Sequence, residues 1–263
     1  MTTVREIEKA LLSAAPARWK MDWDNVGLLC GRYDSPVTRV MVALDAMPDV
    51  FEEAKAAGCE LIVTHHPVVF GSFRAVNDDD FTGRNLLWLI ENGIAAINLH
   101  TNLDVAPEGV NQILAETVGL RDIRVIDPTD TDDRGRDVGL LHCGTVEPTD
   151  LRTFTARVKE ALHCPGIRFA DAGKPVHFVA VGGGACGSEL AEVKAAGCDT
   201  FVSAEFRYND FEEAKYRGVN LVDAGHFCTE DPVCAYLERL LKDAFPDLCV
   251  LRAKNHKDEM QFL

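Results

Sequence analysis

The sequence predicts an α/β protein with a mainly parallel sheet, and three observations lead to this prediction. Short apolar runs rich in β-branched residues alternate along the chain with amphipathic helical stretches, the rhythm of βα units. One such unit recurs at residues 51–67, 190–206 and, more loosely, 211–227. With 263 residues and 47% hydrophobic content, the chain is long enough to bury a sizeable core.

The amino-terminal part contains two predicted strands, at residues 60–64 and 94–100. A helical stretch at 51–59 precedes the first strand, and another around 85–91 precedes the second. Helical residues 110–120 follow the second strand. This alternation favours parallel pairing, because the helix between two strands returns the chain to the starting edge of the sheet.

Residues 127–137, DPTDTDDRGRD, combine Pro, Gly and Asp with no apolar periodicity. Such a stretch is typical of a linker or surface loop. We therefore place the domain boundary there. The first half, residues 1–126, then carries THHP and HTNLD, and the second half, residues 127–263, carries a glycine-rich loop and GHFCTE.

The second half continues the same rhythm of strands and helices. A strand is predicted at residues 138–146, followed by a helix that Thr149 or Asp150 opens. A strand ending at residues 177–181 then leads into the glycine loop and further αβ units.

The charge balance of the chain excludes some classes of partner. Lys and Arg number 27 against 42 Asp and Glu, a formal net charge of -15. Such a charge argues against nucleic acid or an anionic membrane as a partner, but a small ligand carried with metal remains compatible. No apolar run approaches the roughly 18 residues of a membrane span. The amino terminus is charged and polar, so we expect a cytoplasmic protein.

The nine cysteines do not suggest a disulfide framework. Their number is odd, and no pair has CxxC spacing. Reduced, mostly buried thiols are the favoured interpretation, with a cysteine zinc knuckle as the remote alternative.

Histidines and a carboxylate follow the two amino-terminal strands. His65 and His66 come directly after the first, where two adjacent imidazoles could reach two metal ions about 3.5 to 4 Å apart. Asp104 follows the second strand and would be either a metal ligand or a helix cap. His100 lies nearby as a partner of the ligands or as a buried strand histidine.

His226 and Glu230 end the third repeat, four residues apart, so a helical turn would aim both at one point. Glu230 alone could be a first-turn acid favoured by the helix dipole. A carboxylate can also bridge two ions. Five ligands for two ions would leave open positions for water or substrate, as catalytic sites require.

The loop from Gly182 to Gly187 matches GxGxxG, and Glu205 follows about 20 residues later. This pattern is a dinucleotide fingerprint and raises the alternative of an NAD-type oxidoreductase. The glycines could instead let a strand turn tightly into a helix. Their backbone amides could also bind a substrate phosphate.

Five ordered motifs closely resemble those of the Nif-three-like family. These YbgI-type dinuclear metal proteins are also called type 2 GTP cyclohydrolase I homologues. The motifs are WDNVGL at 23–28, THHP at 64–67, HTNLD at 100–104, GGG at 182–184 and GHFCTE at 225–230. The resemblance extends from about residue 4 to the C-terminus.

The resemblance implies two similar, interlinked α/β halves with mixed, mainly parallel sheets, and a ring-shaped homohexamer. It implies two divalent metal ions per chain, with Zn, Fe, Mn and Ni equally compatible with the donors. Glu230 would be the bridging carboxylate. The implied metal ligands are His65, His66, Asp104, His226 and Glu230.

Residues 203–209, SAEFRYN, keep the family's acid as Glu205 but lack the histidine commonly found shortly after it. Without that histidine, no residue is assigned to a second proton-transfer step. Asn25 and Glu205 are candidates for ordering the site, against the alternatives of a turn or a helix cap. The candidate catalytic residues are Glu230, His100 and Glu205, and the candidate substrate-binding residues are Gly183, Gly184 and Asn25.

The function these patterns favour is metal-dependent hydrolysis of a nucleotide or related phosphorylated small molecule, as in type 2 GTP cyclohydrolase I. A proton donor for the leaving nitrogen would have to be His100 or Glu205. The alternatives are a non-catalytic metal carrier or regulatory binding protein and, less favoured, the NAD-type oxidoreductase.

Overall fold

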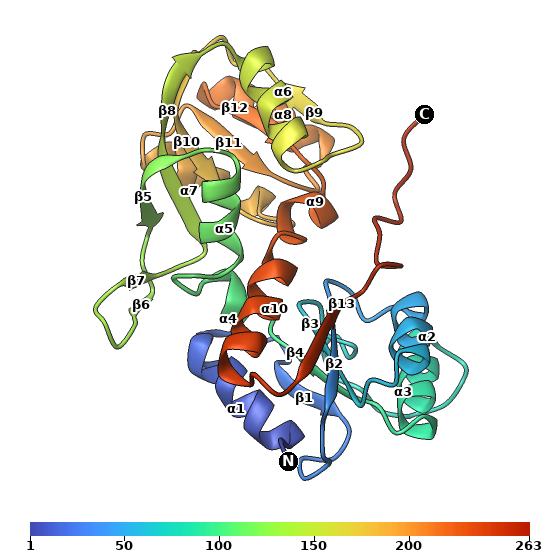
Figure 1. Cartoon of the computed structure of the whole chain (residues 1–263). Helices are drawn as coiled ribbons and strands as arrows, with labels where there is room; N and C mark the ends of the chain where they lie inside the picture. Colours follow the sequence, from blue (N-terminus) through green and yellow to red (C-terminus); the bar gives the residue numbers. More distant parts are fainter. The chain divides into compact units, whose positions relative to one another are not determined.

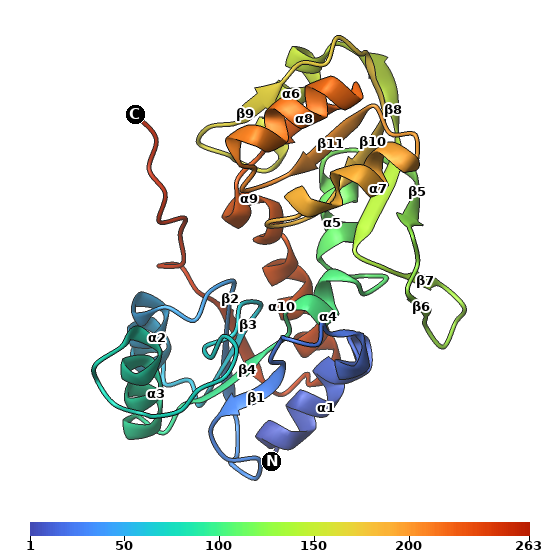
Figure 2. The same ribbon diagram turned by 180° about the vertical axis from the view of Figure 1, so that it is seen from behind.

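The computed structural model describes all 263 residues, which form two compact units (Figure 1). The first unit consists of Met1–Leu103 and Val233–Lys257, and the second of Asp104–Pro232 and Asp258–Leu263. Each unit contains a sheet with helices on both faces, which Figure 2 shows from behind. The predicted α/β class with mixed sheets is therefore confirmed.

The sheet of the first unit has five strands, and only the pair β1 and β4 is antiparallel. Every residue of β3 and β4 is buried, as expected for strands covered on both faces. In spatial order the strands are β1 (Gly27–Cys30), β4 (Ala95–Asn98), β3 (Leu61–Thr64), β2 (Arg39–Ala43) and β13 (Cys249–Arg252).

Helices α2 and α3 lie on one side of this sheet, with α1 and α10 on the other (Figures 1 and 2). A capping box between Thr3 and Glu6 fixes the start of α1. Phe51 of α2 and Leu89 of α3 join one core with Ile62 of β3. The helices are α1 (Val4–Ala14), the short η1 (Ala17–Trp19), α2 (Pro48–Ala56), α3 (Phe81–Glu91) and α10 (Val233–Ala244).

The sheet of the second unit is mixed, with a parallel centre and antiparallel margins. Strands β10, β11 and β12 are parallel, but the other three pairs are antiparallel. The expectation of mainly parallel pairing therefore describes the first sheet better than the second. The spatial order is β5 (Arg121–Ile126), β8 (Leu141–Thr149), β10 (Val176–Val181), β11 (Thr200–Ser203), β12 (Asn220–Asp223) and β9 (Arg168–Ala170).

Alternate residues of these strands face two different helix pairs. Val202 of β11 packs in the core that contains α5 and α6, whereas its neighbour Phe201 packs with α7 and α8. Asp150 caps α6 through the amide of Thr153, as predicted for that helix start. The helices are α5 (Val110–Thr117), α6 (Leu151–Ala161), η2 (Gly187–Glu189), α7 (Leu190–Ala195), α8 (Tyr208–Arg217) and α9 (His226–Glu230). The short α4 (Thr101–Asp104) lies where the chain passes from the first unit to the second.

The three sequence repeats are three helix–turn–strand pairs, α2 with β3, α7 with β11 and α8 with β12. The glycine of each turn, Gly58, Gly197 and Gly218, has a positive φ of 68°, 85° and 71°. This conformation favours glycine, because a side chain would be strained there. The second and third repeats are neighbours in one sheet, whereas the first belongs to the other unit.

The two units differ from the predicted halves 1–126 and 127–263. Residues 104–126 belong to the second unit, and α10 and β13 return to the first, where β13 pairs with β2. The stretch 127–137, predicted as a linker or surface loop, lies within the second unit. Its strands β6 (Asp130–Thr131) and β7 (Asp137–Val138) form a hairpin, and its turn residues explain the missing apolar periodicity.

None of the helices combines the length and the apolar character that crossing a lipid bilayer demands. Eight of the nine cysteines are buried, and Cys249 on β13 is exposed.

Candidate functional site

In the first unit, polar side chains follow the carboxyl ends of three adjacent parallel strands. Asp45 comes two residues after β2, His65 and His66 come directly after β3, and His100 comes two residues after β4. Parallel strands end at the same edge of a sheet, so these residues gather there, as ligand-binding residues do in α/β proteins.

The three histidines form one cluster. The ring centroids of His65 and His66 lie 4.9 Å apart, and those of His100 lie 5.3 Å from His65 and 5.6 Å from His66. One ring nitrogen of each lies within 4.8 Å of the others, so the cluster could hold a metal ion. The sequence predicted His65 and His66 as metal ligands, and His100 as a candidate catalytic residue, a partner of the ligands or a buried strand histidine.

Hydrogen bonds orient the first two imidazoles. The Nδ1 of buried His65 donates to the carbonyl oxygen of Leu99 at 2.8 Å, and the Nδ1 of His66 lies 2.6 Å from Oδ1 of Asp45. A carbonyl oxygen only accepts, so the proton of His65 is on Nδ1 and the lone pair is on Nε2. Metal-binding histidines commonly have this arrangement.

His100 is held in the same way by Asp24. Its Nδ1 lies 2.8 Å from Oδ1 of Asp24, while the amide and hydroxyl of Thr101 donate to Oδ2 at 3.0 and 2.6 Å. Burial raises the pKa of Asp24, but the hydrogen bonds from His100 and Thr101 outweigh it and hold the pKa below its usual range. Asp24 therefore stays ionised and accepts the Nδ1 proton.

The second unit repeats this plan on strands β10, β11 and β12. The glycine loop follows β10, Glu205 follows β11, and His226 begins α9 just after β12. These strands are parallel, so their carboxyl ends also meet at one edge. Glu205 of the second repeat and His226 of the third therefore lie at the same edge of this sheet.

Two carboxylates contact the imidazole of His226. Its Nδ1 lies 2.7 Å from Oε1 of Glu205, and its Nε2 lies 3.1 Å from Oε2 of Glu230. The φ of Glu205 is 57°, an uncommon conformation for a residue with a side chain. This backbone places the Glu205 carboxylate against His226, so Glu205 orients the histidine and leaves Nε2 facing Glu230.

Asp104 ends the short helix α4 and is buried. A carboxylate oxygen of Asp104 lies within 4.8 Å of one of Glu230. The backbone carbonyl of Asp104 accepts a 3.0 Å hydrogen bond from Nδ2 of Asn111, whose Oδ1 accepts the amide of Gly183 at 2.6 Å. The fully buried Asn111 side chain thus ties α4 to the glycine loop.

The glycine loop makes room for the acidic group of the second unit. A Cβ at Gly184 would lie 2.3 Å from Oε1 of Glu230 and 3.0 Å from Nε2 of His226. The amide of Gly184 donates to Oγ1 of Thr229 at 3.0 Å, and that of Gly183 donates to Asn111. Both amides are therefore hydrogen-bonded within the protein.

Cys186 lies beside these acids without the character of a ligand. Burial, followed by the charges of Asp104 and Glu230, raises the pKa of its thiol. The protonated sulfur donates to the carbonyl of Gly183 at 3.2 Å. Metal ligation requires the thiolate, so the donors of this group are the imidazole and the carboxylates.

Asn25, a predicted substrate-binding residue, holds a loop instead. Its Nδ2 donates to the carbonyls of Val69 and Gly71 at 3.1 and 2.6 Å. The backbone carbonyl of Asn25 accepts a hydrogen bond from Nδ2 of Asn98 on β4.

The residues that position the others were not predicted from the sequence. Two of them are carboxylates that hydrogen-bond a histidine: Asp24 holds His100 and Asp45 holds His66. The other two accept hydrogen bonds from the glycine loop: Asn111 from Gly183 and Thr229 from Gly184. Asp24 lies within the WDNVGL motif, and Asp45 follows β2 just as the histidines follow β3. Thr229 lies within the GHFCTE motif, so three of these residues had a signal in the sequence, whereas Asn111 looks like an ordinary helix residue.

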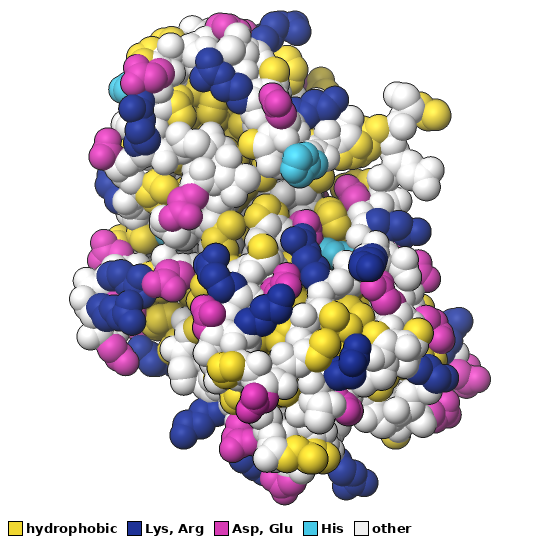
Figure 3. All heavy atoms as spheres, in the orientation of Figure 1, with side chains coloured by type: hydrophobic (Ala, Val, Ile, Leu, Met, Phe, Trp, Pro, Cys, Tyr) yellow, Lys and Arg dark blue, Asp and Glu magenta, His cyan; other side chains and the backbone are white.

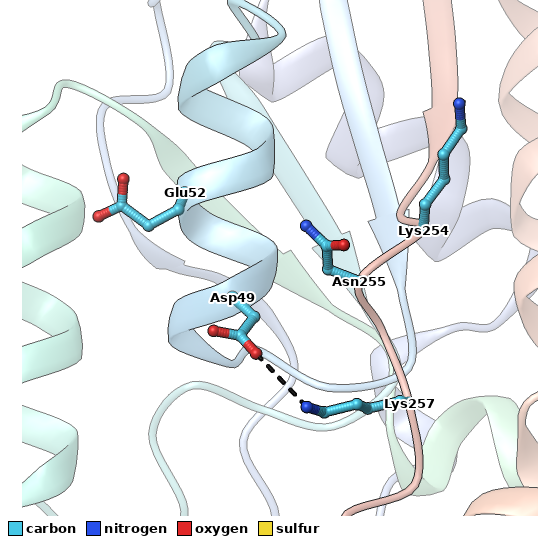
Figure 4. A pocket seen from close by; sticks show the side chains of 5 residues that line it. All are labelled: Asp49, Glu52, Lys254, Asn255 and Lys257. Carbon is cyan, nitrogen blue, oxygen red and sulfur yellow. Dashed lines mark ion pairs between the residues drawn. The ribbon is translucent and has the colours of Figure 1, made fainter.

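A different surface pocket lies between α2 and the segment after β13, and Figure 4 shows its lining. The Nζ of Lys257 lies 3.8 Å from Oδ2 of Asp49. The backbone amides of Lys254 and Asn255 donate to Glu53. None of the predicted site residues lines this pocket, and these contacts fasten the C-terminal segment to α2.

Acidic and basic side chains are interspersed on the face drawn in Figure 3.

Comparison with known proteins gives one family. Residues 2–259 match the family described as Duf34/NIF3, NGG1p interacting factor 3. The "GTP cyclohydrolase 1 type 2 homolog" of Streptomyces coelicolor is 37% identical over 238 residues, covering 89% of this chain and 84% of the relative. The protein of that name from Clostridium perfringens is 30% identical and covers 99% of both chains.

Among solved structures, the crystal structure of Staphylococcus aureus hypothetical protein SA1388 is similar to this chain with a TM-score of 0.90. The two are 27% identical, and the match covers 99% of each chain.

Proposed function

Because this chain belongs to the Duf34/NIF3 family, we propose that it is a dinuclear divalent-metal protein that hydrolyses a nucleotide or a related phosphorylated small molecule. The family match confirms the resemblance drawn from the five motifs. The names of the Streptomyces coelicolor and Clostridium perfringens relatives suggest a chemistry like that of a type 2 GTP cyclohydrolase 1.

The observation that carries the proposal is the orientation of the donor atoms. In the first unit, hydrogen bonds at Nδ1 leave Nε2 of His65 as the ligand atom, and His66 is held in the same manner. In the second unit, Nε2 of His226 and Oε2 of Glu230 lie 3.1 Å apart. Imidazole nitrogens with carboxylate oxygens suit Zn, Fe, Mn and Ni.

The proposed metal ligands are those that the sequence predicted, and they would hold two divalent ions per chain. When bound, such ions acidify water and act as Lewis acids toward a carbonyl or phosphoryl oxygen. The ligands are His65 and His66 of the first unit with Asp104, His226 and Glu230 of the second.

The remaining residues orient ligands and move protons. Glu205 holds His226 through Nδ1, which fixes the tautomer and the direction of Nε2. Asp24, kept ionised, accepts a hydrogen bond from Nδ1 of His100 and orients its imidazole ring. His100 is therefore our candidate for the proton donor to a leaving nitrogen.

Metal content tests the ligand assignment. We expect about two ions per chain in the purified protein and a clear loss in His65→Ala and Glu230→Gln, measured by inductively coupled plasma mass spectrometry. His163→Asn, at an exposed histidine, is the matched control and should retain both ions. Equal metal content in all variants would contradict the ligand assignment.

Turnover tests the reaction. Metal-loaded protein is assayed against a panel of nucleotides and phosphoesters, with His65→Ala and Glu230→Ala as controls. Product formation that both variants lose would support a hydrolase. Full metal binding with no turnover above these controls would contradict it and favour a metal carrier or regulatory protein.

We extend the proposal to the assembly that the family resemblance implies, a homohexamer. Light scattering coupled to size-exclusion chromatography should then give six times the 28.9 kDa chain mass. A monomer mass at micromolar concentration would contradict the hexamer and leave the metal ligands untouched.

A further inference from the structure

Two large aromatic side chains in the first unit are exposed and yet pack against each other. Trp23 is 54% exposed and Phe70 is 64% exposed. Their ring centroids lie 5.5 Å apart, with an angle of 33° between the planes. Large apolar rings in water cost free energy, so a fixed, exposed pair is typical of a binding surface.

The pair is held in place by Asn25. Phe70 lies between Val69 and Gly71, and both of these backbone carbonyls accept hydrogen bonds from Nδ2 of Asn25. Asn25 is two residues from Trp23, and its own amide donates to Asp24 at 2.8 Å. One amide side chain therefore fixes the loop of Phe70 relative to the turn of Trp23.

Both rings border the histidine cluster. The centroids of Trp23 and Phe70 lie 5.9 and 5.6 Å from that of His100, with interplanar angles of 73° and 64°. His100 in turn contacts His65 and His66. A flat ligand stacked on the aromatic pair would lie beside the proposed proton donor and metal ligands.

We infer that Trp23 and Phe70 form a stacking platform for a planar heteroaromatic ring of about the size of a nucleobase. The inference rests on the proposed function, because it assigns the substrate class of that same site. A chain with a net charge of -15 gives a phosphorylated ligand little long-range attraction. Stacking needs no charge and stabilises a bound base on an aromatic side chain substantially.

The test uses the full-length, metal-free protein and guanosine, with ribose 5-phosphate as the non-aromatic probe. Isothermal titration calorimetry should detect guanosine more readily than ribose 5-phosphate. Trp23→Leu and Phe70→Leu should each weaken guanosine binding about tenfold. Trp23→Phe, which keeps an aromatic face, should restore part of the affinity.

Phe81→Leu is the matched control, because Phe81 is 54% exposed in the same unit and makes no ring contact with His100. It should bind guanosine as the parent does. Equal binding by all variants, or equal affinity for both probes, would overturn the platform. A change of oligomeric state in Phe70→Leu without a change in guanosine affinity would also overturn it, since the rings would then be a subunit contact.

Failure of this inference is separable from failure of the proposed function. Guanosine affinity is measured without metal and without turnover, so a chain that stacks guanosine but hydrolyses nothing would keep the platform and lose the hydrolase. Conversely, turnover that survives Trp23→Leu with an unchanged KM would overturn the platform and keep the hydrolase.

Discussion

The carboxylate of Glu230 lies directly against the backbone of Gly184, and this contact makes position 184 sensitive to a single methyl group. Gly184 has φ +63°, and an added Cβ would lie 2.3 Å from Oε1 of Glu230. The side chain of Glu230 is nearly buried and has little room to move away. Glycine is thus needed at position 184 to leave space for the Glu230 carboxylate, and not only to form the turn.

We expect Gly184→Ala to lower metal affinity at least tenfold, because the methyl group displaces Glu230 and His226. Competition with a chelating dye measures the affinity. Gly197→Ala is the control for backbone strain alone, since Gly197 also has a positive φ but a Cβ added there would meet nothing within 4 Å. Equal affinities of the two variants would contradict the displacement.

His142 on β8 makes stability depend on pH. Burial lowers its pKa to about 4, although a hydrogen bond with the backbone of Leu140 opposes the shift. Below about pH 6.5, His142 becomes protonated in the unfolded chain, whereas in the folded chain it becomes protonated only near pH 4. The contribution of this residue to stability is therefore complete above pH 6.5 and is lost as the pH falls toward 4.

Between pH 7 and pH 5 we expect this one group to lower the free energy of unfolding by about 2 kcal/mol. Urea unfolding at both pH values measures the loss, which should be smaller in His142→Asn. The exposed His163 gives the control, and His163→Asn should keep the parent's pH dependence. The same pH dependence in His142→Asn would exclude His142 as its source.

At the scale of elements, helix α5 is joined to the site through Asn111. Its side chain donates to the carbonyl of Asp104 and accepts the amide of Gly183. Asn111→Leu keeps the approximate volume but leaves two buried polar groups without these partners, which should cost about 3 kcal/mol. Urea unfolding measures the cost.

Gln112→Leu is the control on the same helix, because Gln112 bonds only the exposed Glu116 in this structure. Its effect should stay within about 0.5 kcal/mol. A loss in Asn111→Leu no larger than that of Gln112→Leu would contradict a role for Asn111 in joining the two elements.

Much of the element order could be predicted from the sequence. The predicted strand at 60–64 is β3 (Leu61–Thr64), and Asp150 opens α6 as its side chain suggests. The local pattern determines these features. The antiparallel margins of the second sheet depend on which strands become neighbours, and periodicity within a strand carries no information on that.

The candidate site was predictable only in part for the same reason. Side chains that follow a parallel strand could be expected at one edge, as for His65 and Glu205. The partners that orient them come from distant segments: Asp24 is 76 residues from His100, and Asn111 is 72 residues from Gly183. No local pattern in the sequence relates such pairs.

At the scale of the whole molecule, the last strand belongs to the first unit. β13 pairs with β2 at the edge of that sheet, and Val250 of β13 is 5% exposed. We expect Val250→Asp to bury an unpaired charge and to destabilise the first unit by about 3 kcal/mol or more. Hydrogen exchange should increase in β2 and β13, while β10, β11 and β12 stay protected.

Cys249→Ser, at the exposed neighbouring position, is the control and should leave exchange unchanged in both sheets. Equal loss of protection in the two sheets on Val250→Asp would contradict two separately stable units.

The return of α10 and β13 determines the order in which a ribosome can deliver finished parts. When residue 103 has emerged, the amino-terminal sheet still lacks its fifth strand and the helix α10 that packs on β2 and β13. The segment 104–232 is synthesised next and contains its whole sheet. The nascent protein can therefore complete the sheet of the second unit before that of the first. The open edge of β2 needs protection from aggregation until β13 has been synthesised.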